Sequence, residues 1–463
     1  MIKKVIKILL TIFLILILVI SYLSIFGIKT NKLNNQITDN ILKINKKINL
    51  SLGEVNYLLN PFDFTVNIKT KNPKISLEGR NLEIEDIQTN VALKSLINDQ
   101  LSIDDLKIKT KKIKLKDIIA SVRIFKNSPQ LFILNTVIKD GYVTVNINLT
   151  FDERGKVKDN YKINGSVLGA KFNILNRFKL KNLNFNFDIA NNTYLLDQID
   201  MKLNSIKISS PLITIKKKKK SFLVNGQFLS DSKNFNIDEF KPFFANLFKD
   251  ISVQKIKFSS NNNFSFNFNK NLKFDNFKVE SSIDLNQLIF NEKNFKLKSY
   301  LPSFIEEIKL EEHKIIINYN KNALNIKGSG NILLEDKLDN LSYEIVKDNN
   351  DFLFNSKINI KNNSLLIDFL DYEKKGGLSS SVILKGIYKE NNQLRFDLIN
   401  FKEKNNEISI KDLDLNQNFK IIDIENFNIN YKNNKKFFNR LNLKKDNSNF
   451  IIEGESFDAS RII

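Results

Sequence analysis

The chain has 463 residues, 42% of them hydrophobic, with 72 Lys and Arg against 51 Asp and Glu, a formal net charge of +21. This composition excludes a disordered chain, and the absence of Cys together with a single His excludes disulfides and thiolate sites and argues against His-rich metal centres. Only 7 of the 72 basic residues are Arg, which indicates AT-rich coding rather than selection for phosphate contacts, so no nucleic-acid partner is expected.

The first predicted element is a membrane-spanning helix. Residues 8–26 carry no charge, and as a helix they would extend about 28 Å, enough to cross a bilayer core. Three lysines precede this run and predict a cytoplasmic N-terminus: Lys3, Lys4 and Lys7. A cleaved signal peptide is the alternative, but no small-residue cleavage site follows, since the first Ala is Ala92. We therefore expect an uncleaved anchor over residues 1–28, with the bulk of the chain across the membrane.

Residues 29–60 are predicted to form an amphipathic exit helix followed by a connector. Apolar residues recur there at steps of three and four, as on one face of a helix: Leu33, Ile37, Ile41, Ile44 and Ile48. A plain connector with one apolar side accounts for this pattern as well as a helix lying on the membrane surface does, and both interpretations stay open.

From residue 61 onward the apolar period changes from 3.6 to 2. Strict alternation gives each strand one apolar and one polar face, whereas a central parallel strand would be apolar on both. Residues 61–463 are therefore predicted to be mostly β, an elongated, curled antiparallel sheet with a few short amphipathic helices. The clearest runs supply candidates for the lining of an apolar groove, with an ordinary closed core as the alternative for each: Val143, Val145, Ile147, Leu149, Leu183, Phe185, Phe187, Phe264, Phe266 and Phe268.

No linker divides residues 61–463. The turns are short and rich in Asn and Asp, which tolerate the backbone of tight hairpins, and the chain has only 14 Gly and 6 Pro. Five strands carry an internal glycine, typical of bulges or bends, at intervals too irregular for a repeat: Gly165, Gly226, Gly328, Gly386 and Gly454. The run Lys216–Lys220 predicts a hairpin tip that guards against edge pairing, with anionic headgroups as the alternative contact.

Two helical interruptions of the strands are expected. Residues 238–249 carry apolar side chains at helical spacing: Phe240, Phe243, Phe244, Leu247 and Phe248. A weaker helical turn is expected over residues 302–308. A lid over one end of the apolar face is the favoured role of the first helix, and a gate or a partner contact is the alternative.

The sequence contains no motif for catalysis or cofactor binding. Nucleophile-elbow, phosphate-loop, dinucleotide and zinc-protease patterns are all missing. Acidic residues flank the single histidine, but their alternating context indicates a solvated strand edge: Glu306, Glu307, Glu311 and Glu312. We therefore expect His313 at the surface, no metal site, no cofactor and no enzymatic activity.

The order of these features resembles the AsmA-like family of bacterial envelope proteins, which includes the TamB- and YhdP-type members. The likeness rests on the N-terminal anchor, the exit helix and a first β module, and it is one of pattern without an invariant motif. The segments that carry it are residues 60–66, 82–87, 95–97, 101–106 and 113–118, with a later echo at 453–460.

This resemblance implies a taco-shaped β-groove that extends from the bacterial inner membrane into the periplasm and carries phospholipid toward the outer membrane. A single-pass inner-membrane protein that supports envelope integrity is therefore expected. Its implied partners are phospholipid, the inner membrane, and outer-membrane or other envelope proteins. The chain is short for the bridge-length members and ends at Ile463 in what reads as the middle of a module, so an N-terminal portion of a longer member, or a truncated gene, is expected.

Surface area supports the groove independently. About 25 strands at ~4.8 Å spacing would give roughly 120 Å of groove, with more apolar surface than a few helices can cover. Sheets this wide curl, and acyl chains would bind such a surface by about 0.8 kcal/mol per buried CH₂. The alternative function is a structural or assembly factor for outer-membrane biogenesis that recruits proteins through its sheet edges.

Overall fold

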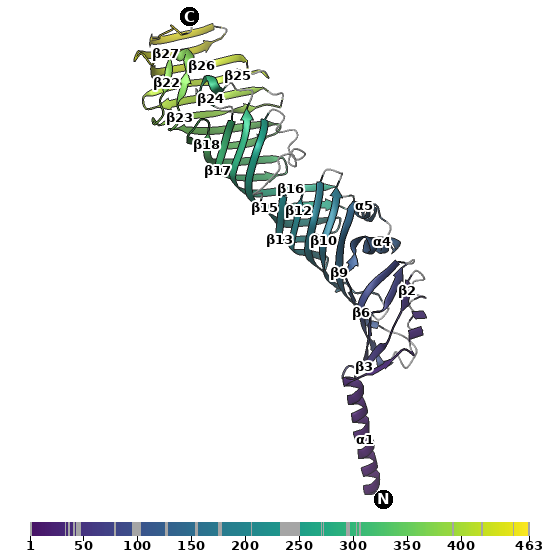
Figure 1. The fold of residues 1–463 in the computed structure, drawn as a ribbon. Coiled ribbons are helices and arrows are strands. Elements are labelled where there is room, and N and C mark those ends of the chain that lie inside the picture. Colours follow the sequence, from purple (N-terminus) through teal and green to yellow (C-terminus); the bar gives the residue numbers. More distant parts are fainter. Residues whose placement is uncertain are drawn as a thin grey trace. The chain divides into compact units, whose positions relative to one another are not determined.

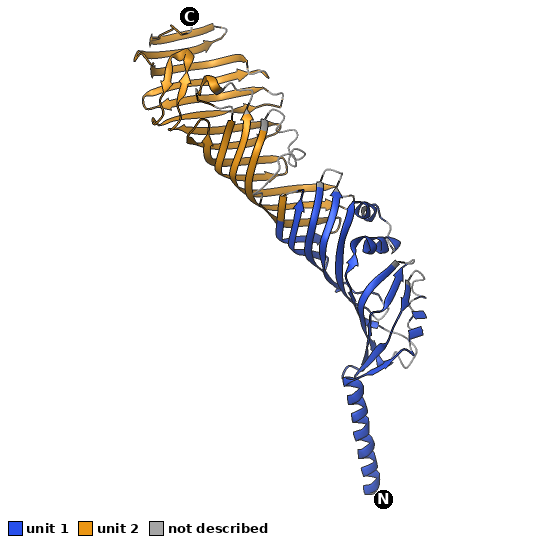
Figure 2. Ribbon diagram, viewed as in Figure 1, with its two compact units in different colours: residues 1–204, 209–217 blue, residues 205–208, 218–463 orange. Residues whose placement is uncertain are grey.

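The computed structural model describes the chain in two compact units, residues 1–204 with 209–217 and residues 205–208 with 218–463 (Figure 2). Most described residues beyond the first helix lie in antiparallel strands, so the predicted mostly β class is confirmed. The description covers residues 2–461 except the following: 33, 36–37, 40–41, 43–47, 78–79, 95–102, 126–127, 153–155, 175–177, 205, 232–250, 270, 272, 293–296, 302, 305–306, 391–392, 418–419 and 448.

Helix α1 (Ile2–Ile25) is the predicted anchor, and it is long and apolar enough to span a membrane (Figure 1). None of its spanning window is buried by the rest of the chain, which suits a helix whose surroundings are lipid. The three predicted orientation lysines, Lys3, Lys4 and Lys7, lie in its first two turns. The chain leaves the helix through Gly27, whose φ of 68° and whose approach to the Tyr57 carbonyl leave no room for a side chain.

Residues 29–60 contain strands in addition to helical residues, since Asn34, Asn35, Thr38, Asp39 and Leu42 are helical. They contribute strands β1 (Ile28–Thr30), β2 (Ile48–Ser51) and β3 (Val55–Asn60). Most of the predicted helical face lies outside the described residues (Leu33, Ile37, Ile41 and Ile44), and Ile48 begins β2. Long-range packing explains the strands, because Val55 is buried with Val66, Ile68 and Val91 of other strands.

Unit 1 is an antiparallel sheet in which β1, β3, β4, β6, β7, β9, β10, β11 and β12 pair in that order, while β2 and β5 form a second ladder with the first half of β6 (Figure 1). The remaining bounds are β4 (Thr65–Lys71), β5 (Lys74–Leu77), β6 (Arg80–Ala92), β7 (Ile103–Thr110), β8 (Ile113–Lys114), β9 (Ile138–Thr150), β10 (Lys162–Ile174), β11 (Phe178–Ala190) and β12 (Thr193–Leu203). Strand β13 (Ile206–Lys217) has residues in both units.

Two unpredicted helices, α4 (Leu115–Phe125) and α5 (Pro129–Val137), interrupt unit 1 between β8 and β9. The segment 113–118 was expected to be a strand, but the strand ends at Lys114. Helix α4 packs Leu115 and Ile118 on the apolar face of the sheet. Helix α5 begins at Pro129 after an N-cap at Ser128, whose hydroxyl accepts the N–H of Leu131.

Unit 2 is a long antiparallel meander in which each strand of the sheet pairs with the next one along the chain. Among the described strands, β28 pairs with β27 alone, so the sheet is open at that edge. The strands are β14 (Ser221–Asp231), β15 (Ile251–Asn269), β16 (Phe274–Glu292), β17 (Glu307–Asn320), β18 (Ala323–Leu333), β19 (Leu338–Asp348), β20 (Asp351–Ile360), β23 (Ser380–Tyr388), β24 (Leu394–Glu403), β25 (Asn406–Leu415), β26 (Ile421–Lys432), β27 (Phe438–Asp446) and β28 (Asn449–Ser456).

An insertion between β20 and β23 contains β21 (Leu365–Ile367), the 3-10 turn η3 (Asp368–Leu370) and β22 (Tyr372–Lys374). A further 3-10 turn, η2, spans Leu297–Ser299. The helix predicted over residues 238–249 lies outside the described residues, as does part of the turn predicted over 302–308, whose last two residues already belong to β17. Lys216–Lys220 are exposed and include the turn between β13 and β14, as predicted.

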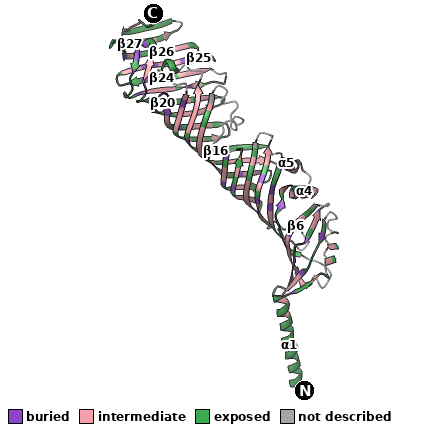
Figure 3. Ribbon diagram, viewed as in Figure 1, coloured by how far each residue is buried: buried purple, intermediate pink, exposed green. Residues whose placement is uncertain are grey.

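The buried residues that the structure describes form small clusters rather than one continuous core (Figure 3). Most apolar strand residues are only half-buried, because each covers its neighbours in the sheet from one side. This half-burial leaves an apolar face in each unit, and the candidate functional site is built on these faces.

Candidate functional site

The predicted lining residues of unit 1 share one face of the sheet. Along β9, Val143, Val145, Ile147 and Leu149 alternate with polar residues, as the sequence predicts. In the register of the sheet, Val145 lies opposite Gly165, which lies opposite Phe187. Val143 is likewise linked to Phe185 through Val167, and Leu183 lies opposite Ala170. All seven candidates of this unit are thus brought onto the same surface.

One end of this surface is covered by helix α4. Val143 is buried with Val167 and Ala170 beneath Leu115 and Ile118 of the helix, so it belongs to a closed core. Leu183, Phe185 and Phe187 pack at the margin of that cluster and stay partly exposed, as do Ile147 and Leu149. The surface of unit 1 therefore combines a covered end with a more open stretch.

The candidates of unit 2 belong to a larger set of contacting rings, which we call the aromatic ladder. Phe222 stacks on Phe268 with 4.9 Å between ring centroids, and Phe228 stacks on Phe264 at 4.8 Å. Phe266 lies 6.0 Å from Phe264, which continues the series along β15. The ladder consists of Phe222, Phe228, Phe264, Phe266, Phe268, Phe274, Phe277 and Tyr319.

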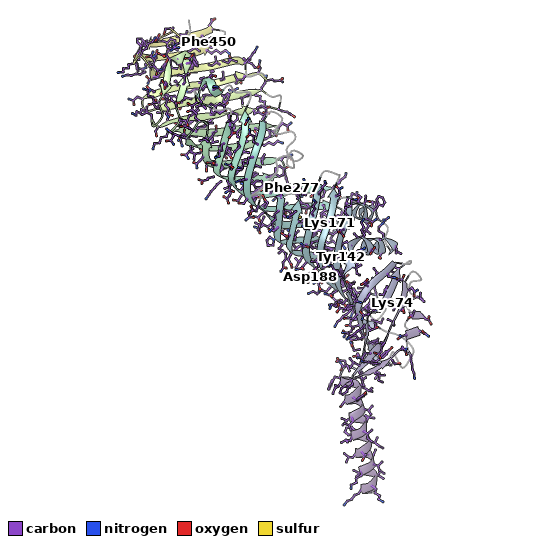
Figure 4. All side chains as sticks on the ribbon, in the orientation of Figure 1. Lys74, Tyr142, Lys171, Asp188, Phe277 and Phe450 are labelled. Atoms are coloured by element: carbon purple, nitrogen blue, oxygen red, sulfur yellow. The ribbon has the colours of Figure 1, made fainter. Side chains whose placement is uncertain are left out.

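A bulge brings Phe277, which is labelled in Figure 4, into the aromatic ladder. The register between β15 and β16 shifts between Ser265 and Asn267, and Asn276 has a φ of 51°. The extra residue reverses the side-chain alternation, so the Phe277 ring lies 5.9 Å from Phe266 and 6.0 Å from Tyr319. Alternation counted along β16 without the bulge does not place Phe277 on the apolar face. The only sequence signal for this residue was its aromatic side chain.

The apolar face of unit 2 continues across eight strands, from β17 to β26. One cross-strand row is apolar at every position: Ile317, Ile326, Ile345, Phe354, Gly386, Phe396, Leu413 and Ile424. Seven spacings of about 4.8 Å make this row roughly 34 Å long. All its side chains except Leu413 are partly exposed. We call this set the apolar row.

Aromatic rings lie over the glycines of these faces. A Cβ at Gly165 would be 2.7 Å from the Phe187 ring, and one at Gly386 would be 2.8 Å from the Phe354 ring. At Gly328 it would be 2.3 Å from the Tyr343 ring. Gly226 lies directly opposite Phe264 in the ladder. At Gly165, Gly328 and Gly386 an aromatic ring therefore occupies the space that a side chain would fill. Gly454 differs, because a Cβ there would meet the backbone of Arg440 and Leu441.

The insertion closes the apolar face of unit 2 at one margin. Leu370 and Tyr372 are buried with Phe401, Ile408 and other residues of the sheet. Leu301 and Phe304, which follow η2, are likewise buried with residues of the sheet, among them Ile308 and Ile332. The Tyr431 hydroxyl donates to the Leu370 carbonyl at 2.7 Å, and the Tyr372 hydroxyl donates to Glu403. Burial raises the pKa of Tyr372, and Glu403 raises it further.

A buried polar network holds this insertion in place. Asp339 accepts the backbone N–H groups of Lys361 and Asn362 at 2.8 and 2.9 Å. The Asn363 side chain donates to the same carboxylate at 2.7 Å. The fully buried Lys374 lies within the field of Asp339, Glu403 and Glu335, but burial has the larger effect and lowers its pKa. The Asp339 carboxylate and its donors satisfy one another, whereas Oδ1 of Asn363 has no hydrogen-bond partner among the described residues. The network has the pattern of a structural clamp.

The position of His313 corrects the sequence-based expectation of a surface residue. Its side chain is fully buried on the apolar face, because it shares the alternation of Ile315 and Ile317. Nε2 donates to the Asn331 carbonyl at 2.9 Å, the ring stacks on Tyr343, and burial lowers the pKa of the imidazole. Strand β17 is interior, between β16 and β18, and not at an edge.

The acidic residues near His313 do not assemble around it. Glu311 pairs with Lys309 at 2.5 Å, and Glu312 accepts from the Asn331 side chain, while Glu306 lies outside the described residues. In the part of the chain that the structure describes, no group of three or more His, Asp or Glu side chains is placed to hold a metal ion.

Sequence comparisons do not assign the chain to a family. No protein-family profile matches it, and no curated protein matches it at a significant level. The anchor helix, the open antiparallel sheets and their apolar faces therefore carry the functional argument.

Proposed function

We propose that this chain is a membrane-anchored conduit for phospholipid. Helix α1 would hold it in the bacterial inner membrane with the N-terminus in the cytoplasm, and the sheets would lie in the periplasm, as in the AsmA-like proteins that the sequence resembles. The observation that carries the proposal is the apolar row of unit 2, which crosses eight strands. Its side chains are partly exposed except at the buried Leu413, and Gly386 contributes no side chain between Phe354 and Phe396.

The energetics of such a surface suit acyl chains. Each CH₂ group that leaves water contributes about 0.8 kcal/mol, whatever its position along the chain. Because the apolar row runs across the strands, an acyl chain lying along it would pass from one strand to the next without meeting a charged side chain. The aromatic ladder adds further apolar area in the same unit. Carrying lipid in this way requires no catalytic group.

Lipid analysis of the purified chain tests the proposal. The full chain is extracted in mild detergent and the bound lipids are quantified by mass spectrometry against a membrane protein of similar size with a single anchor helix. We expect phospholipid well above the level that the anchor alone retains. Lipid no higher than in the single-helix control would contradict the proposal.

A specific observation also favours the alternative, recruitment of a protein partner. Strand β28 pairs on one side only among the described strands, and it exposes Phe450 (labelled in Figure 4), Ile451 and Ile452. Such an edge offers unpaired backbone groups to an incoming strand. The variant Ile452→Lys should abolish capture of an envelope protein by the immobilised chain while leaving its lipid content unchanged. Unchanged capture would argue against this edge as the partner site.

A further inference from the structure

The polar face of unit 2 contains a hollow of about 600 Å³ over β17, β18, β19, β20 and β23. We propose that this hollow binds a phosphate group, carried either by a lipid headgroup or by a small soluble molecule. The site lies on the face opposite the apolar row, so it is independent of the conduit proposed above.

The register of the sheet explains why the polar face is hollow here. Lys314 of β17 lies opposite Ser329, which is followed by Ser342 and then by Lys357 of β20 in the same cross-strand row. The two small serines form the floor, and the long lysines stand at its two sides. In the adjacent row, Lys327 and Lys385 add one further ammonium group on each side.

The charge of the hollow is not balanced. Lys327 pairs with Glu344 at 3.0 Å, and Asn325 also donates to that carboxylate at 3.2 Å, so the one acidic group of the lining is already engaged. Lys314, Lys357 and Lys385 have no carboxylate within ion-pair distance among the described residues. Some basic residues elsewhere in this unit do have such partners, as Lys309–Glu311, Arg395–Asp412 and Arg440–Glu455 show.

This arrangement fits a phosphate better than a simple carboxylate. A phosphate presents several oxygens at once, and here three uncompensated ammonium groups surround two exposed serine hydroxyls, all of which can donate. Ile316, which is 53% exposed, and Ile383 flank the lysines and offer apolar contact to the carbon skeleton of the ligand. The volume lies within the range of small-molecule sites.

Titration calorimetry on the full chain in non-ionic detergent tests the site. The two phosphate probes are glycerol 3-phosphate and short-chain phosphatidylglycerol, and glycerol is the phosphate-free probe. The double variant Lys314→Gln/Lys357→Gln should weaken phosphate binding by about tenfold or more. The matched control Lys411→Gln/Lys444→Gln removes the same charge from exposed positions of β25 and β27 outside the hollow, and it should bind as the unmodified chain does. A second variant, Ser342→Asp, should abolish binding by placing a carboxylate in the floor.

Each outcome decides the matter. Binding of phosphatidylglycerol alone, lost in the hollow variants, supports the site and assigns the phosphate to a lipid headgroup. Binding of glycerol 3-phosphate at equal or greater strength, lost in the same variants, supports it and assigns a soluble ligand. No binding of either phosphate probe, equal binding of glycerol, or an equal loss in the control variant would overturn the proposal. Circular dichroism of every variant checks that the sheet is retained.

Discussion

The ammonium group of Lys374 is fully buried and donates a hydrogen bond of 2.5 Å to the backbone carbonyl of Asn363. A second bond of 3.0 Å reaches the carbonyl of Lys361, so one side chain ties two positions of the same insertion together. This insertion closes one margin of the apolar face, so the two hydrogen bonds of Lys374 fix where that face ends.

Removing this buried charge should loosen the insertion. The substitution Lys374→Met leaves two carbonyls without their donor and Asp339, Glu335 and Glu403 without a nearby cation, and it should cost about 3 kcal/mol. Hydrogen exchange of residues 361–374 measures the loss as faster local opening. The control Lys375→Met removes an exposed neighbour and should leave exchange unchanged. Equal protection in both variants would contradict the clamp.

The stability of unit 2 should fall as the pH drops below about 6.5. Burial lowers the pKa of His313, so below its ordinary value the unfolded chain holds a proton that the folded chain does not. Each unit of depression removes about 1.4 kcal/mol once the pH has passed below the folded pKa. The chain has one His, so urea midpoints at pH 7.5 and 5.5 should converge in His313→Gln. A variant that keeps the pH dependence of the unmodified chain would refute this assignment.

A charge within the aromatic ladder should displace lipid. Phe266 contacts Phe264, Phe268 and Phe277, and an acyl chain brought against a carboxylate there would lose roughly 2 kcal/mol or more. Phe266→Asp should therefore retain much less phospholipid on purification. Asn263→Asp adds the same charge to an exposed position of the same strand and should retain the normal amount. Similar lipid content in the two variants would show that the ladder is not in the lipid path.

The Tyr343 ring requires a glycine at position 328. A Cβ there would come 2.3 Å from the ring, so Gly328→Ala should destabilise unit 2 by about 2 kcal/mol. Removing the ring relieves the clash, so Gly328→Ala/Tyr343→Ser should be more stable than the sum of the two single changes predicts. Urea denaturation of the four proteins measures this coupling. Strict additivity would mean that ring and glycine do not interact.

Cysteine labelling tests the orientation that we predict from Lys3, Lys4 and Lys7. The chain has no Cys, so Asn191→Cys places a single thiol in an exposed turn of unit 1. A membrane-impermeant maleimide should label it in cells with a permeabilised outer membrane while the inner membrane is intact. Replacing the three lysines with Gln should reduce this labelling, because the positive-inside bias is removed. Labelling only after lysis of the inner membrane would show that the chain has the opposite orientation.

Local patterns predicted the anchor and the strands because each is encoded within a few residues. The uncharged run of residues 8–26 and the alternation along β9 and β15 need no long-range information. The placement of Phe264, Phe266 and Phe268 on one face follows from the same alternation. Whether such residues line an open face or a closed core was not encoded locally, as Val143 shows, since its cover comes from α4.

Local sequence patterns did not predict the features that depend on residues far away in the chain. Residues 113–116 alternate like a strand, yet Leu115 and Ile118 become one side of α4 because they pack against β9 and its neighbours. Phe277 was missed because the bulge at Asn276 reverses the alternation. Lysine is ordinarily exposed, so nothing local marked Lys374 for burial; its site exists only once the insertion folds against Asp339.

The one-sided meander of unit 2 has a consequence for how it comes apart. Its strands make their main contacts with the two strands beside them, as repeats in a solenoid do, and not with a facing sheet. Stability is then a sum of neighbour terms, and a defect in β15 need not be felt at β26. Unfolding should begin at the weakest strand pair and spread outward, so a urea midpoint measured for a variant of this unit reports mainly the strands nearest the substituted residue.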